Sequence, residues 1–215
     1  MDGTQPNATP WVGVYARFPQ FRSRSASTNV LEDRINDCFE RSMNGRSLPP
    51  NSREMRDIVD YMAFLSMGVP VGSEVEGPGL PKLRVLTGDT TRGARGFADN
   101  CARCHAAEGG GTTPAPLVWG PWSYNVAAGM ARMRTAASFI RYNMPADHAG
   151  TLTDQIAFDI AAFVDTRPRP DFPGKERDWP RGDAPPDVPY RTLANPQSGI
   201  AIPSALARAR RQARR

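Results

Sequence analysis

Cys101-Ala102-Arg103-Cys104-His105 is the stretch of sequence that decides how this chain is interpreted. A C-x-x-C-H run is the attachment motif of c-type haem. On one turn of helix, two thiols three residues apart reach the two vinyl groups of one porphyrin, and the next residue lies beneath the iron. We therefore predict haem c attached to Cys101 and Cys104, with His105 as an iron ligand. A carbonyl near Pro114 or Pro116 is expected to accept a hydrogen bond from the other nitrogen of His105.

Two other kinds of site use a C-x-x-C pair, namely a redox disulfide and half of a zinc site. A zinc site needs further ligands, and the only other histidine of the chain is His148. A thioredoxin-like motif needs a βαβ context, which the sequence does not show. Haem attachment is therefore the preferred interpretation.

The iron needs a second axial ligand, and Met144 is the best candidate. It lies 39 residues after His105 and follows a predicted helix over residues 135–142. Pro145 disfavours a helical backbone at Met144, so the side chain can turn toward the iron. His/Met ligation raises the reduction potential, which suits an electron carrier. The alternatives are Met130, Met133, His148 and an iron whose sixth position is open.

Composition excludes some classes of protein. The chain has 215 residues, 40% of them hydrophobic, which is enough for one domain or two small ones. The net charge of +5 permits docking on an acidic partner, but no basic face with interleaved aromatic residues indicates nucleic-acid binding. No apolar run approaches the roughly 20 residues of a membrane span. The polar opening residues 1–4 do not resemble a secretory signal peptide.

Helical patterns surround the haem motif. Apolar residues recur at helical spacing over residues 153–165, and Thr153 is a suitable N-cap. A shorter helix is predicted over residues 91–100, where Gly93 and a phenylalanine four positions later suit a close helix–helix crossing. These patterns predict an all-α cytochrome c-like domain over residues 86–167.

The first half of the chain repeats the second. Residues 54–65 align with residues 155–166 at an offset of 101, and the inward positions of the two helices coincide. The same offset pairs Met43 with the predicted axial methionine and Cys38 with a core phenylalanine. Residues 1–74 are therefore predicted to be a second cytochrome c-like domain. It is incomplete, because its first helix and its own C-x-x-C-H are missing.

Two helices are predicted in this first half. The earlier one covers residues 29–43. The later one begins near Asn51, which with Glu54 resembles a capping box.

The start of the first domain, the segment between the domains and the segment after them give further expectations. Residues 1–6 resemble the loop after His105, so we expect a sequence truncated at its N-terminus, with a signal peptide and a first haem motif upstream. The alternative is a natural single-haem protein with a decayed first domain. Haem attachment outside the cytoplasm predicts a periplasmic location. Residues 75–85 are predicted to be a linker, and the Pro-rich residues 168–215 an extended strap with a basic tail.

The chain resembles the dihaem c-type cytochromes related to thiosulfate dehydrogenase. Besides the haem motif, the resemblance rests on residues 11–15 (WVGVY), 18–21 (FPQF), 34–45 (RINDCFERSMNG), 143–145 (NMP) and 169–175 (RPDFPGK). In that family, the resemblance implies, thiosulfate is oxidised to tetrathionate at a first haem, whose iron is held by a His and a Cys thiolate. Cys38 matches the thiolate position. Arg24, Arg34 and Ser42 are similar to positions that line the substrate pocket. The second haem would pass electrons to an external carrier.

The sequence departs from the family at two points. The first haem motif is absent, and Asn143 stands where some members carry Lys. Alternatives therefore remain in the first half. In one alternative, Cys38 is a buried core thiol and Met43 is the iron ligand instead. In another, Arg24 and Arg34 are solvated.

Three functions follow from these patterns. The first is a c-type cytochrome that carries electrons through one haem c of this chain. The second is a thiosulfate dehydrogenase, an oxidoreductase with a further haem, and the third is a decayed, haem-poor binding module. The expected partners are an electron donor or acceptor protein, such as another cytochrome, and thiosulfate or tetrathionate for the enzyme.

Overall fold

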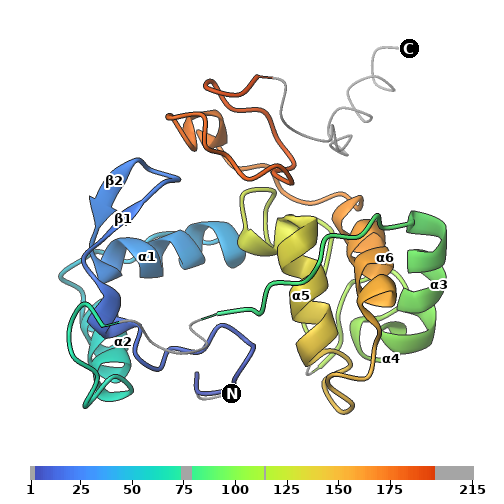
Figure 1. Cartoon of the computed structure of the whole chain (residues 1–215), viewed down its shortest axis with the longest axis horizontal. Helices are drawn as coiled ribbons and strands as arrows, with labels where there is room; N and C mark the ends of the chain where they lie inside the picture. The colour runs from blue at the N-terminus through green and yellow to red at the C-terminus, as the bar shows by residue number, and fades with distance from the viewer. Residues whose placement is uncertain (1–2, 74–78, 114, 197–215) are drawn as a thin grey trace.

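The structure, a computed structural model, describes residues 3–73, 79–113 and 115–196 (Figure 1). The start of the chain, the first residues of the predicted linker and the basic tail lie outside these residues. No helix of the described part is long and apolar enough to cross a membrane.

The second half contains four α-helices and a short 3-10 helix: α3 (Thr90–Asn100), α4 (Ala102–His105), η3 (Gly129–Ala131), α5 (Met133–Asn143) and α6 (Asp154–Asp165). α6 is the central helix, because α3 packs along one side of it and α5 along another (Figure 1). Every residue from Ala157 to Asp165 is consequently buried. Thr153 caps α6 by accepting a hydrogen bond from the backbone N–H of Ile156, which confirms the predicted start.

α3 crosses α6 closely at Gly93. A Cβ atom there would overlap the carbonyl oxygen of Asp159 and would lie 2.8 Å from Cβ of Phe163. Phe97, one turn later on the same face, is buried, with its ring centroid 4.9 Å from that of Trp119. The predicted crossing at Gly93 and Phe97 is confirmed.

The first half is smaller and less regular. Its elements are η1 (Tyr15–Arg17), β1 (Gln20–Arg22), β2 (Ser27–Asn29), α1 (Leu31–Asp37), the π-helix η2 (Cys38–Ser42) and α2 (Arg53–Phe64). β1 and β2 pair antiparallel, so the expectation of an all-α fold is only approximate. This hairpin was not predicted, because strands of three residues are too short to show an alternating pattern.

The predicted helix over residues 29–43 has two parts. α1 ends at Asp37, and in η2 the carbonyl oxygen of Cys38 accepts a hydrogen bond from the N–H five residues later, at 3.0 Å. A π-turn holds more residues than an α-turn, so it changes the directions of the side chains that follow. α2 begins after Ser52, whose side chain caps it, so the cap predicted at Asn51 was one residue early.

Residues 168–196, called the strap, follow α6 and lie above both halves in the view of Figure 1. They contain one short helix, η4 (Lys175–Arg177). Three of their side chains pack with Ala127 in a separate buried cluster: Trp179, Val188 and Tyr190. The N–H of Trp179 donates to the carbonyl oxygen of Arg24 at 2.8 Å, so the strap contacts both halves of the chain.

Candidate haem and substrate sites

The haem-attachment motif forms one helical turn at the end of α3. Cys101 interrupts the helix with φ −120° and ψ −35°, and α4 follows. The backbone N–H groups of Cys104 and His105 both donate to the carbonyl oxygen of Cys101, at 3.1 Å and 2.9 Å. Both cysteines are free thiols and are available for thioether bonds.

A backbone carbonyl orients the ring of His105. Nδ1–H of His105 donates to the carbonyl oxygen of Pro116 at 2.8 Å. Because a carbonyl oxygen can only accept, this bond places the ring proton on Nδ1 and leaves Nε2 for a metal. The predicted hydrogen bond is therefore confirmed at Pro116, while Pro114 lies outside the described residues.

Met144 lies where α5 ends. Its backbone is extended, with φ −122° and ψ 149°, as expected for a residue before proline. Its side chain is partly buried against the core that also contacts Cys101, Met130 and Met133. The side chain of His148, an alternative candidate for the second iron ligand, is 71% exposed. Met144 as the axial ligand stays a prediction.

An ion pair joins the haem motif to the loop that follows Met144. Nη2 of Arg103 contacts both carboxylate oxygens of Asp147. The guanidinium of Arg103, and after it His148, holds the pKa of Asp147 well below its usual range, at about 2. The loop and the attachment turn are thus linked by charge as well as by the core.

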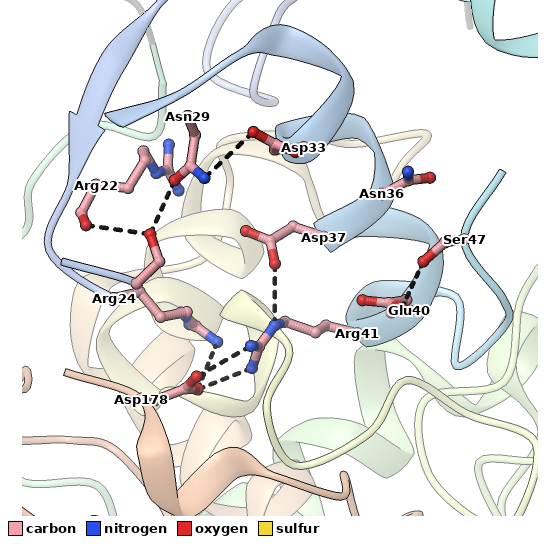
Figure 2. Close-up of a pocket in the computed structure, with 11 residues that line it drawn as sticks. Arg22, Arg24, Asn29, Asp33, Asn36, Asp37, Glu40, Arg41, Ser47 and Asp178 are labelled. Atoms are coloured by element: carbon pink, nitrogen blue, oxygen red, sulfur yellow. Dashed lines mark hydrogen bonds and ion pairs between the residues drawn. The ribbon is translucent and has the colours of Figure 1, made fainter. Parts of the chain in front are cut away.

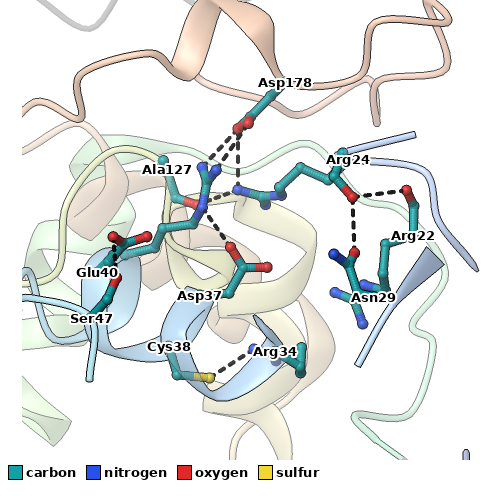
Figure 3. A network of polar contacts seen from close by, with 12 residues as sticks. Arg22, Arg24, Asn29, Arg34, Asp37, Cys38, Glu40, Ser47, Ala127 and Asp178 are labelled. Carbon is teal, nitrogen blue, oxygen red and sulfur yellow. Dashed lines mark hydrogen bonds and ion pairs between the residues drawn. The ribbon is translucent and has the colours of Figure 1, made fainter. Parts of the chain in front are cut away.

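Cys38 opens the π-helix and faces Arg34, which lies one turn earlier. Nη1 of Arg34 donates to Sγ of Cys38 at 2.7 Å (Figure 3). Both side chains are partly buried. A guanidinium beside sulfur offers hydrogen-bond donors to a negative charge on that sulfur, or on an anion next to it.

The other two predicted substrate residues lie apart from this pair. Nη1 of Arg24 donates to a backbone carbonyl at 2.7 Å and lies 3.4 Å from a carboxylate oxygen of Asp178 in the strap. Ser42 ends the π-helix and is exposed. Met43, the alternative iron ligand in this half, is 64% exposed.

A cavity of about 290 Å³ lies between the β1–β2 hairpin, the α1–η2 segment and the strap (Figure 2). Its arginines are Arg22, Arg24 and Arg41. Its acidic residues are Asp33, Asp37, Glu40 and Asp178. Acidic groups outnumber guanidinium groups, and two of the three arginines pair with Asp178. The cavity therefore does not offer a free cationic surface to an anion.

The sequence patterns did not identify Arg41 or Asp178 as site residues. Arg41 donates two hydrogen bonds to Asp178, at 2.8 Å and 3.0 Å. Burial lowers the pKa of Arg41, but the bonds to Asp178 outweigh burial and hold this pKa above its usual value. The i,i+4 spacing of Asp37 and Arg41 could have revealed a local pair. No sequence signal points to Asp178, which lies 137 residues after Arg41.

The second half fits a covalently bound haem. Two free thiols lie on one turn, and the imidazole has Nε2 free because its Nδ1–H is bonded to Pro116. The thioether of Met144 packs against the same core as Cys101. Nitrogen and thioether sulfur are the axial donors of haem iron in cytochromes c. The helical fold and these residues together define a c-type cytochrome.

Family models match both halves. The model described as "SoxA/TsdA, cytochrome c domain" matches residues 5–71, and the one described as "Cytochrome C oxidase, cbb3-type, subunit III" matches residues 88–164. The chain is 42% identical to a thiosulfate dehydrogenase from Psychrobacter arcticus, over 87% of this chain and 59% of the relative. It is 46% identical to one from Allochromatium vinosum, over 79% and 66% of the two chains.

A solved structure of similar fold is the thiosulfate dehydrogenase (TsdBA) from Marichromatium purpuratum in its "as isolated" form. The TM-score is 0.77 at 32% identity, over 92% of this chain and 46% of that chain. This chain belongs to the family of haem c-binding cytochromes that includes the thiosulfate dehydrogenases, as the sequence resemblance implied. It spans 59% and 66% of the lengths of the two relatives above.

Proposed function

We propose that this chain transfers electrons through haem c attached to Cys101 and Cys104, with His105 and Met144 as the iron ligands. The observation that carries the proposal is the hydrogen bond from Nδ1–H of His105 to Pro116, which sets the tautomer and the ring direction of a ligand. When bound, haem c supplies a one-electron carrier, and His/Met ligation raises its potential.

The proposal includes two cytochrome c-like units, over residues 1–74 and 86–167, with a linker at 75–85 and the strap and tail at 168–215. The two family models, at residues 5–71 and 88–164, support this division. Because haem c is attached outside the cytoplasm, we place the protein in the periplasm, with another cytochrome as its electron partner.

The ligand assignment is tested by Met144→Ala, with Met130→Ala as the matched control. Both side chains are partly buried against the same core, so both variants lose similar packing. Only Met144→Ala is expected to lower the midpoint potential by more than about 59 mV, a tenfold change for a one-electron couple. Equal potentials of Met144→Ala and wild type would exclude Met144.

We also propose a second function, the oxidation of thiosulfate to tetrathionate at Cys38. The specific observation in its favour is the 2.7 Å hydrogen bond from Arg34 to Sγ of Cys38. Two thiosulfate ions join through a new S–S bond and release two electrons, which leave singly to a one-electron acceptor. The names of the relatives and the resemblance support this function, with Cys38 as a ligand of a further haem.

Thiosulfate-dependent reduction of ferricyanide tests this second function. Arg34→Gln removes a charged donor, and such bonds contribute about 1.5–3 kcal/mol, so we expect kcat/KM to fall roughly 10-fold to 150-fold. Arg53→Gln is the control, because the Arg53 side chain is 85% exposed in a surface pair. Activity that survives Cys38→Met unchanged would show that Cys38 is not the site.

A further inference from the structure

The strap brings one buried carboxylate to the turn that carries Cys38. The side chain of Asp178 is 8% exposed, and it accepts the two hydrogen bonds from Arg41. The hydroxyl of Tyr190 donates to the same carboxylate at 2.6 Å, and Nη1 of Arg24 lies 3.4 Å away. Because loss of one partner leaves a buried charge unpaired, such a cluster holds its members in one geometry.

Arg41 connects this cluster to Cys38 through the helix that both residues share. Arg41 lies three residues after Cys38 in η2, and its Nε donates to Asp37, the residue before Cys38, at 3.2 Å. In the view of Figure 3, Asp178 lies on one side of this segment, and Cys38 with Arg34 lies on the other. Arg41 and Cys38 therefore share one short helix, and the side chain of Arg41 is bonded on both sides of it.

The backbone of the same turn is held from the second half of the chain. Asn125 is 1% exposed, and its backbone N–H donates to the carbonyl oxygen of Arg41 at 3.1 Å. Its Nδ2 donates to the carbonyl oxygen of Glu40 at 2.8 Å. The end of a helix leaves its last carbonyls without partners inside the helix, and Asn125 satisfies two of them. Asn125 thus fixes the backbone, while Asp178 fixes the side chain of Arg41.

We propose that Asp178 is a positioning residue for the Cys38 site: by engaging Arg41 and Arg24, it sets where Sγ of Cys38 lies relative to Arg34. This inference rests on the proposed function in that Cys38 is taken as the reacting site. Asp178 also occupies the guanidinium groups of Arg24 and Arg41. Arg34 is then the arginine whose donors face the sulfur.

The test compares Asp178→Asn with Asp183→Asn in the full-length holoprotein. Both variants remove one carboxylate from the strap, but Asp183 is exposed. The first readout is the alkylation rate of Cys38 by iodoacetamide under native conditions, followed by mass spectrometry. The second is kcat and KM for thiosulfate. Unfolding free energies of both variants, from guanidinium titration, separate native alkylation from alkylation through global unfolding.

We expect Asp178→Asn to change the native alkylation rate of Cys38 at least fivefold and to lower kcat at least tenfold, with KM changed less than threefold. Asp183→Asn is expected to match wild type. If the alkylation rate of Cys38 and the kcat of Asp178→Asn both lie within twofold of the values for Asp183→Asn, the inference is wrong. If Asp178→Asn does not fold, Arg41→Lys keeps the charge but loses the paired bonds, and a change in alkylation of at least twofold is expected. An unchanged rate in Arg41→Lys would also refute it.

The two proposals fail separately. If wild type does not oxidise thiosulfate, the second proposed function is wrong. The alkylation rates then still decide whether Asp178 positions Cys38.

Discussion

Substitution of Gly93 by alanine tests the packing that supports the haem motif. Gly93 lies in the middle of α3, which leads directly into Cys101. The new methyl group would overlap the carbonyl oxygen of Asp159, and it would lie 2.6 Å from that residue's carbonyl carbon and 2.8 Å from Cβ of Phe163. The blocking atoms belong mainly to the backbone of α6 and cannot rotate away, so the two helices must separate.

The expected cost follows from two opposing effects. Overpacking of a well-packed core costs about 1–3 kcal/mol, and more where backbone blocks the new atoms, so we take about 3–4 kcal/mol here. Alanine favours a helix over glycine by about 1 kcal/mol, which offsets part of this cost. The free energy of unfolding should therefore fall by about 2–3 kcal/mol.

Guanidinium unfolding of the holoprotein, followed by circular dichroism, measures this change. Gly110→Ala is the control, because nothing lies within 4 Å of a Cβ at that position. We expect the control to lie within about 0.5 kcal/mol of wild type, as surface substitutions usually do. If Gly93→Ala also stayed within that margin, the close crossing of α3 and α6 would not support the haem motif as we argue.

Two further predictions concern pH. Arg103 lowers the folded-state pKa of Asp147 from 3.8 to about 2, so the contribution of this pair to stability is present above about pH 4 and is lost as pH falls toward 2. Acid titration can be followed by the absorption band expected from the proposed Met144–iron bond. Loss of this band should therefore begin at higher pH in Asp147→Asn than in wild type, and identical curves would contradict this. Burial raises the pKa of Asp165 to about 7 despite Arg169 at 3.5 Å, so Asp165 binds a proton more tightly in the folded state. The free energy of unfolding of wild type, relative to that of Asp165→Asn, should then fall as pH rises from about 4 to 7. The same difference between the two proteins at pH 5 and at pH 8 would refute this.

Local features of the second half could be predicted because neighbours in sequence decide them. Thr153 caps α6 through a bond to a backbone N–H three residues later, so both partners are visible in the sequence. The crossing at Gly93 was also predictable, since a small residue and an aromatic one share a face of α3. The family resemblance is confirmed by the comparisons, and the alignment to the Psychrobacter arcticus relative covers 87% of this chain.

The first half was harder to predict, for physical reasons. The β1–β2 hairpin has strands of three residues, and the π-helix at Cys38 covers only the five residues Cys38–Ser42. Neither feature leaves a periodic pattern in the sequence. The resemblance grouped Arg24 with Arg34, yet the structure directs Arg24 toward Asp178 and Arg34 toward Cys38.

The sequence by itself indicated covalently bound haem c, because Cys101, Cys104 and His105 lie within one helical turn and the motif is recognised without any distant residue. Only the tertiary structure decided which carbonyl orients His105 and which carboxylate holds Arg41. The first partner is 11 residues away and the second 137 residues away. The sequence narrowed the first partner to a carbonyl near Pro114 or Pro116, and the fold selects Pro116. Over 137 residues chain geometry sets no pairing, and the burial of Asp178, within the strap, against Arg41 selects it.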